Sequence, residues 1–251
     1  IDNLALAQQL LADYRKPRPE VRQISLSDMS GKVLASSHAA GRNVQRDVAD
    51  QSGFQDFARD ANDLHDIYLG RPQRDVQGQD WVFTLRHVLR DAQGQPRAVL
   101  TDMFPVDFLE SLWQDAPLVQ QITVGVLRDD GYLMSRYPVP ATVTKDEVYG
   151  TRRDGALIRY LTQHQFPVQG RVEGPNALLN GQNFINLFHR LDKLPATVFV
   201  GQPEIRLFQV WARSIDTPLA LTALLLVFIK LVSRRLARRE QEAEQQRLAV
   251  E

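Results

Sequence analysis

An apolar run close to the C-terminus constrains the fold of this chain more than any other feature. Residues 218–229 (PLALTALLLVFI) contain no charged side chain, and extending the run to 217–232 adds only Lys230. A membrane-spanning helix normally needs about twenty apolar residues, and a shorter run is also typical of a helix buried in a soluble core. The residues on either side of the run therefore decide between the two interpretations.

The flanking residues favour a membrane helix. Four arginines crowd residues 234–239, and a positive cluster of this kind marks the cytoplasmic end of a span. Lys230 lies one turn earlier, so its amine can reach the same interface. The run is apolar on every side, whereas a helix docked on a soluble domain needs a polar face. We therefore predict a transmembrane helix, with its lead-in, over residues 207–233.

The tail that follows the predicted span, residues 234–251, mixes positive and negative charges and contains neither Pro nor Gly. This pattern predicts that the helix continues into the cytoplasm as a signalling helix, and that it offers a surface for pairing with a second copy. A homodimer is therefore expected. A frayed terminal tail is the alternative that such a short pattern leaves open.

Bulk composition narrows the class of protein. The 251 residues suffice for two modules of about 100 residues each. The formal net charge is zero, so there is no basic surplus to hold nucleic acid. The absence of cysteine excludes disulfides and thiolate chemistry. The chain opens on Ile1 without a visible signal peptide, and we expect the native N-terminus to lie upstream.

The order of predicted elements repeats once before the apolar run. After an amphipathic N-terminal helix, a hairpin turns at Asp28, and two longer strands follow over residues 81–104. The second half has a hairpin turning at Asp129 and a strand pair over residues 183–203. This repeat predicts two similar modules behind one N-terminal helix. The predicted boundaries are a helix over 1–19, a membrane-distal module over 20–113 and a membrane-proximal module over 114–206.

Catalytic and metal-binding motifs are missing from the sequence. The five histidines form no HExxH pair, no serine lies in a GxSxG context, and no glycine-rich phosphate loop is present. Asp28, Asp129 and Asp130 lie in turns, where an aspartate most often bonds its own backbone. We therefore predict no metal, no cofactor and no enzyme activity for this region. A membrane-anchored enzyme with these aspartates as acid and base is the alternative.

A binding pocket is the function that the first module suggests. The segment 50–68 is polar, aromatic and irregular, as expected of a cover over one face of a small sheet. Trp81, Phe83 and Leu85 alternate along one strand, so Arg86 points to the opposite face. A guanidinium offers two parallel donors to a carboxylate or phosphate. The alternative roles of Arg86 are a surface position or an ion pair with Asp102.

The order of motifs over residues 1 to about 212 resembles the double Cache (PDC-type) sensor domains of bacterial membrane receptors. The resemblance rests on these segments: SLSDMSGKVLASS, DVADQSGF, IYLGRPQ, WVFTLRHVLRDAQGQPRAVLTDMFPVDFLESLW and LRDDGYLMSRYP. It implies an α+β fold of two tandem PAS-like modules, each an antiparallel sheet with flanking helices. They are carried on a long N-terminal helix and followed by the transmembrane helix.

The resemblance also implies that a small molecule binds in the distal module. The positions carried over as ligand-binding candidates are Phe54, Tyr68, Arg86 and Asp102, with Trp81 and Phe83 as pocket walls. The motif of the amino-acid-binding members is matched only at Asp102. The expected ligand is a small molecule with an anionic group.

Together these features predict the periplasmic sensing region of an inner-membrane receptor. Residues 1 to about 212 are expected in the periplasm and 234–251 in the cytoplasm, ahead of an output domain such as a diguanylate cyclase or a histidine kinase. The main alternative is a ligand-free, membrane-anchored module that docks a periplasmic partner protein through an exposed apolar patch.

Overall fold

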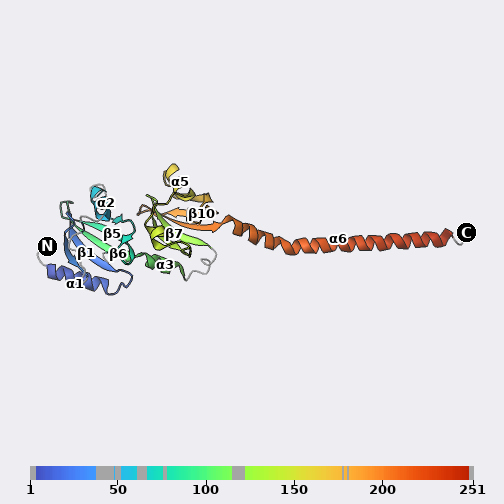
Figure 1. The fold of residues 1–251 in the computed structure, drawn as a ribbon, viewed down its shortest axis with the longest axis horizontal. Helices are drawn as coiled ribbons and strands as arrows, with labels where there is room; N and C mark the ends of the chain where they lie inside the picture. Colours follow the sequence, from blue (N-terminus) through green and yellow to red (C-terminus); the bar gives the residue numbers. More distant parts are fainter. Residues whose placement is uncertain are drawn as a thin grey trace. The chain divides into compact units, whose positions relative to one another are not determined.

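Two antiparallel sheets form the larger of two compact units, residues 1–203 (Figure 1). The computed structural model describes residues 4–37, 48, 52–60, 67–75, 78–114, 122–176, 178–179 and 181–248. The strands of the first sheet, in spatial order, are β2 (Val33–Ser36), β1 (Gln23–Asp28), β6 (Pro96–Pro105), β5 (Trp81–Arg90) and β3 (Ile67–Leu69), with β4 (Gln73–Arg74) also on β5.

The second sheet repeats this topology. Its strands, in spatial order, are β8 (Leu133–Tyr137), β7 (Thr123–Arg128), β11 (Ala196–Pro203), β10 (Asn183–Arg190) and β9 (Gln169–Pro175). In both sheets a hairpin lies on one side of the last strand, and the other strands of the sheet lie on its other side. The predicted α+β architecture of two similar antiparallel modules is confirmed.

The two hairpins fix which residues of the modules correspond. In the first, the Asp28 N–H donates to the Lys32 carbonyl and the Gly31 N–H to the Asp28 carbonyl. In the second, Arg128 and Gly131 make the same pair of bonds. Both glycines have positive φ, 95° and 91°, which a residue with a side chain rarely adopts. Position 28 of the first module therefore corresponds to position 128 of the second.

Helices cover both faces of the sheets. They are α1 (Leu4–Arg15), α2 (Ser52–Asp60), α3 (Val106–Gln114), α4 (Lys145–Tyr149) and α5 (Ala156–Gln163). On the first sheet, α1 packs Ala7 and Leu11 on Leu26, Ala35 and Ala98. The helix α2 covers the other face through Phe54 and Phe57, which contact Tyr68 and Val99.

The first and second sheets share one hydrophobic core. Leu69 and Phe83 of the first sheet belong to the same buried cluster as Leu133, Phe188 and Phe199 of the second. The Phe83 ring stacks on Phe104, with centroids 5.4 Å apart. The two modules therefore pack against each other through this core.

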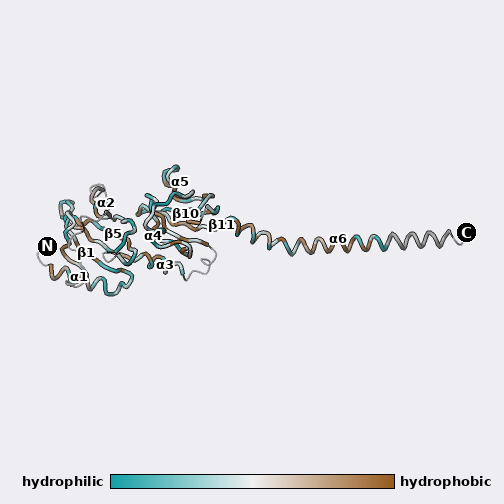
Figure 2. The backbone as a smooth tube through the Cα atoms, viewed as in Figure 1, coloured by the Kyte–Doolittle hydropathy of each residue, from teal (hydrophilic) through white to brown (hydrophobic). Residues whose placement is uncertain are grey.

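The second compact unit is a single helix, α6 (Glu204–Leu248). Its stretch Glu204–Arg235 is long and apolar enough to cross a membrane, and none of its hydrophobic window is buried. Figure 2 shows hydrophobic segments along this stretch, and in the sequence Arg234 and Arg235 stand at its end. Pro218 lies inside the helix, which runs on without a break. By length and composition the helix fits the predicted span.

Candidate functional site

The face of the first sheet beneath α2 carries a row of directly paired residues that includes Arg86. In an antiparallel sheet, residues opposite one another share a face. The row crosses β3, β5, β6, β1 and β2 in that order and consists of Tyr68, Arg86, Thr101, Ser25 and Ser36. An arginine therefore lies among hydroxyl groups on the face that α2 covers.

Arg86 is enclosed by the covering helix and by the strand ends around it. Its side chain is only 2% exposed, and Nη1 donates to the Gly53 carbonyl at 2.9 Å. The guanidinium carbon lies 5.9 Å from the Phe54 ring centroid and 5.8 Å from that of Phe57. Cation–π attraction of this kind offsets part of the cost of removing the charge from water.

Two glycines make room for this guanidinium. A Cβ at Gly70 would lie 2.3 Å from Thr84 Oγ1 and 3.2 Å from Arg86 Nη1. At Gly53 a Cβ would approach Gln73 Oε1 to 2.9 Å. Side chains at these positions would displace the groups around the arginine. Glycine at these two positions therefore lets the backbone lie close to the Arg86 side chain.

The charge of Arg86 is incompletely balanced. The pKa of Arg86 is lowered to about 10, mainly by burial and also by nearby Arg128, while Tyr68 and Asp56 act in the opposite direction. At neutral pH the group stays protonated. Its buried Nε has no hydrogen-bond partner in the described part of the chain, and neither has Ser27 Oγ on the same face. Unsatisfied buried donors of this kind favour an anionic, hydrogen-bonding ligand.

The ligand-binding candidates predicted from sequence divide between the two faces of the sheet. Phe54, Tyr68 and Arg86 come together beneath α2. Residue 85, not residue 86, pairs with Asp102, so Asp102 lies on the opposite face. Trp81 and Phe83 also point away from Arg86 and pack toward the second sheet. The segment 50–68 expected to cover the pocket lies partly outside the described residues, which include 52–60 and 67–68 of it.

Neither alternative role expected for Arg86 holds in the structure. The side chain is buried, so it is not a surface position. It does not pair with Asp102, because that carboxyl faces α1. Burial raises the pKa of Asp102, against the attraction of His87 and Arg18. One of its oxygens, Oδ1, is buried without a hydrogen-bond partner among the described residues.

Trp81 and Phe83 belong to the junction between the two modules. The Trp81 Nε1–H donates to Asp146 Oδ1 at 2.7 Å, and its ring lies 6.2 Å from that of Tyr149. Arg74 also pairs with Asp146. These contacts join β4 and β5 to α4 of the second module.

Ion pairs connect the helix over Arg86 to the second module. Arg71 lies 3.4 Å from Asp56 of α2 and 2.6 Å from Asp130, which follows β7. Arg128 pairs with Asp130 at 3.0 Å and donates to the Leu69 carbonyl. The nearby arginines lower the pKa of Asp130, although its burial raises it. Arg71 and Arg128 could not be predicted as partners from the sequence, because only the packed structure brings residues so far apart together.

The turn aspartates considered as acid or base groups have structural contacts. Asp28 Oδ1 accepts from the Ser30 and Lys32 N–H groups, and these hydrogen bonds lower its pKa, with the Ser30 side chain contributing most. Asp129 forms a two-pronged pair with Arg190, with its nearest distance 2.7 Å. No group of three His, Asp or Glu side chains that could hold a metal ion occurs among the described residues.

Solved sensor domains share this arrangement of two modules. The extracellular domain of rpHK1S-Z16, a protein described as a histidine kinase, is 18% identical, with a TM-score of 0.63 over 81% of this chain and 79% of its own. The periplasmic sensory domain of the Campylobacter jejuni chemoreceptor Tlp1 is 12% identical, with a TM-score of 0.57 over 82% of this chain and 80% of its own.

A third similar structure was solved with its ligand. It is the ligand-binding domain of the Pseudomonas aeruginosa PAO1 amino acid chemoreceptor PctB in complex with L-Gln, 15% identical, with a TM-score of 0.56 over 87% of this chain and 83% of its own. No protein-family model matches the chain, and no curated protein matches it. At these identities the likeness shows the fold, which is that of double Cache (PDC-type) sensor domains.

Proposed function

We propose that this chain is the periplasmic sensing region of a bacterial inner-membrane receptor, and that its distal module binds a small molecule with an anionic group at Arg86. One observation carries the proposal. A guanidinium that is 2% exposed has a single hydrogen bond to the described residues, beneath the helix α2. An anion would restore the interactions that the charge loses on burial.

Phe54 and Tyr68 complete the proposed site. The Phe57 ring lies 5.6 Å from that of Phe54 and 5.5 Å from that of Tyr68, so three aromatic rings border the guanidinium. Such walls suit the apolar part of a small organic anion, while Arg86 and the hydroxyl row fix its polar end. Asp102, Trp81 and Phe83 are left out of this site because they face the other way.

Signalling would follow the ion pairs from the cover to the membrane. A ligand that draws α2 toward Arg86 moves Asp56, and the Arg71–Asp130 pair transmits that movement to the second module. The last strand of that module, β11, runs directly into α6 at residues 203–204. The mechanism is a population shift, since the ligand favours the arrangement that it binds more tightly.

The membrane orientation and the assembly belong to the same proposal. The arginines of residues 234–239 support a cytoplasmic location for the C-terminal end of α6. There a homodimeric helix pair would pass the signal to an output domain, such as a diguanylate cyclase or a histidine kinase. The exposed Leu10 and Tyr14 side chains of α1 offer a further pairing surface.

Ligand-dependent thermal unfolding of the full chain in nanodiscs tests the proposed function. The panel consists of carboxylates, amino acids, polyamines and purines. A ligand at 100 times its Kd stabilises the fold by about 2.7 kcal/mol, a Tm shift of roughly 5–11 °C. Arg86→Met should abolish the shift. Arg90→Met, at an exposed position of the same strand, should leave it unchanged. A flat response across the panel would overturn small-molecule sensing and favour docking of a periplasmic protein.

A further inference from the structure

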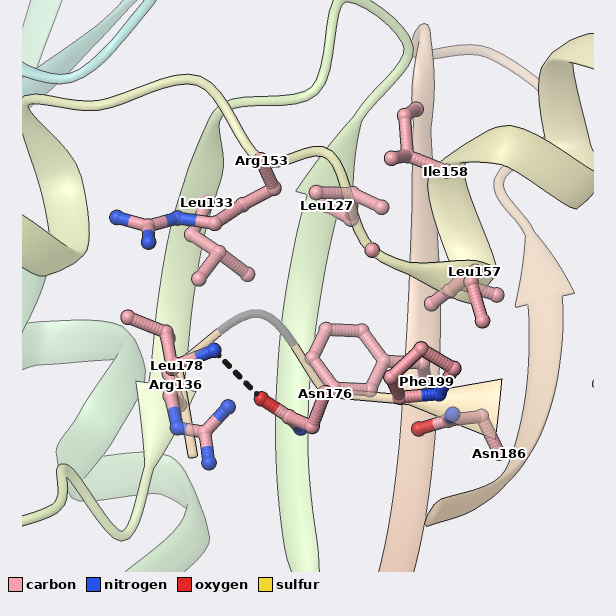
Figure 3. A pocket seen from close by; sticks show the side chains of 13 residues that line it. Leu127, Leu133, Arg136, Arg153, Leu157, Ile158, Asn176, Leu178, Asn186 and Phe199 are labelled. Carbon is pink, nitrogen blue, oxygen red and sulfur yellow. Dashed lines mark hydrogen bonds between the residues drawn. The ribbon is translucent and has the colours of Figure 1, made fainter. Parts of the chain in front are cut away.

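A partly open cavity lies in the proximal module, between its sheet and α5 (Figure 3). The cavity has a volume of about 60 Å³. This is room for a few water molecules or one small organic molecule, and too little for a ligand of drug size. Figure 3 shows Arg136 and Arg153 at one side of the lining, with Leu157, Ile158 and Phe199 at the other.

Arg136 is the most unusual residue of this lining. It projects from β8, is 2% exposed, and its buried Nε has no hydrogen-bond partner among the residues that the structure describes. A guanidinium carries five N–H donors and keeps its charge at neutral pH. The pKa of Arg136 is lowered to about 10, mainly by burial and also by nearby Arg153. An unpaired buried cation is costly, so the site as it stands lacks a counter-charge.

Arg153 increases this need for an anion. Its Nη2 donates to the backbone carbonyl of Val148 at 2.8 Å and to that of Glu147, which fixes the side chain at the end of α4. Its buried Nε has no partner among the described residues. The lining therefore contains two arginines and no Asp or Glu. The Glu147 carboxylate, which attracts Arg153, is itself bonded to Thr144 in the cap of α4.

Two amides add polar groups to the cavity. The Asn176 Oδ1 accepts from the Leu178 N–H at 2.9 Å, which leaves its NH₂ group available to donate (Figure 3). Asn186 is 7% exposed and lies over Gly201, where a Cβ would approach Asn186 Oδ1 to 2.5 Å. The remaining wall is mainly apolar, with Leu127, Leu133 and Phe199 among its residues.

We propose that this cavity is a second ligand site, which takes a small monocarboxylate with Arg136 as its main counter-charge. The carboxylate accepts hydrogen bonds from the unpaired guanidinium, and a short alkyl chain lies against the apolar wall. The volume limits the ligand to roughly two to four carbon atoms. The inference does not depend on the distal site, because no residue of that site lines this cavity.

Binding would act on the signalling end of the molecule. The cavity touches β7, β8, β10 and β11 through Leu127, Arg136, Asn186 and Phe199, and β11 is the strand that leads into α6. A ligand here also fixes α5 through Leu157 and Ile158. The site is therefore placed to adjust the response of the receptor to whatever binds in the distal module.

Thermal unfolding of the full chain in nanodiscs, with acetate, propionate or butyrate added, tests the proposal. Sodium chloride at the same ionic strength is the salt control. At 100 times its Kd, one of the three acids should raise the Tm by roughly 5–11 °C. Arg136→Met should abolish that rise, whereas Arg86→Met, in the distal module, should retain it. Without ligand, Arg136→Met should unfold at the same or a higher temperature, since it removes an unpaired buried charge.

A second variant covers the case in which Arg136→Met does not fold. Asn186→Leu keeps the approximate size of the side chain and should weaken binding of the same acid at least tenfold, measured by calorimetric titration. No Tm rise with any of the three acids would overturn the proposal. A rise that survives Arg136→Met but is lost in Arg86→Met would assign the acid to the distal site instead, and would leave the proposed distal function standing.

Discussion

The two sheets have the same strand order, but the distal sheet carries its buried arginine on an inner strand and the proximal sheet on an edge strand. Because position 28 corresponds to position 128, a row of directly paired residues across the distal sheet can be aligned with one across the proximal sheet. From the β3 edge, the distal row is Tyr68, Arg86, Thr101, Ser25 and Ser36. From the β9 edge, the proximal row is Gly170, Phe188, Phe199, Gly125 and Arg136.

The buried arginine therefore lies on a different strand in each sheet, although the two sheets have the same strand order. In the distal module the central strands carry Arg86 and Thr101, so the charge lies over the middle of the sheet. In the proximal module two phenyl rings fill those positions, and the glycines beside them leave space for the rings. The arginine then comes from the edge strand β8. One fold can therefore hold a charge at two places, depending on where its aromatic residues lie.

The largest expected loss of stability comes from removing the Phe199 ring. In the proximal row this ring occupies the position that Thr101 has in the distal row. Phe199→Ala should cost about 3–5 kcal/mol of unfolding free energy, because the ring is 6% exposed in the shared core. Thr101→Ala should cost less than about 1 kcal/mol, since Thr101 is partly exposed and fills no aromatic position. Chemical denaturation of the full chain in micelles, followed by tryptophan fluorescence, measures both. Equal losses would contradict the proposed division between an aromatic row and a hydroxyl row.

Substitution of Gly125, which lies beside the Phe199 ring, should cause a smaller loss of stability. A Cβ at position 125 would lie 2.7 Å from Phe199 ring carbons and 2.7 Å from the Ser135 carbonyl oxygen. Gly125→Ala should therefore cost about 1–3 kcal/mol by overpacking. At the equivalent distal position, Ser25→Ala should change stability by less than about 0.5 kcal/mol. The same denaturation experiment checks both, and a harmless Gly125→Ala would show that the Phe199 ring is not held in place.

The repeated fold was predictable because its signals are local. Strand alternation and the hairpin turns at Asp28 and Asp129 indicate two similar modules without any knowledge of packing. The same alternation predicted that Arg86 faces away from Phe83, and the strand register confirms it. The helix α6 was predictable from its apolar run, since few other patterns combine such a run with a following arginine cluster.

The features that the sequence did not predict depend on strand register and on irregular pairing between strands. The face of Asp102 follows from the alignment of β5 with β6, which sequence periodicity along a single strand does not contain. The pairing of β7 with β8 shifts register between Val126 and Leu127. Leu133 and Arg136 consequently share a face although they are three residues apart, and simple alternation would have separated them. The sequence pattern therefore does not predict that Arg136 is buried.

The smallest expected effect concerns the reverse faces of the two sheets, where Asp102 corresponds to Val200. Burial raises the pKa of Asp102, so the folded chain holds this proton at higher pH than the unfolded chain does. Stability is thus lost as pH rises from the unfolded pKa through the folded one. Asp102→Asn should therefore raise the Tm at pH 7, and the gain should disappear as the pH approaches 3.

Asp28 is the matched control because its pKa shifts in the opposite direction. Hydrogen bonds from Ser30 and Lys32 lower that pKa, so its contribution to stability is present above the unfolded pKa and is lost as pH falls through the folded one. Asp28→Asn should lower the Tm at pH 7 and have little effect near pH 3. Thermal unfolding of both variants between pH 3 and pH 7 tests these two opposite pH dependences. A fall in Tm for Asp102→Asn at pH 7 would mean that this carboxylate gains more from His87 and Arg18 than it loses by burial, and that the distal sheet is stabilised by a charge where the proximal sheet has Val200.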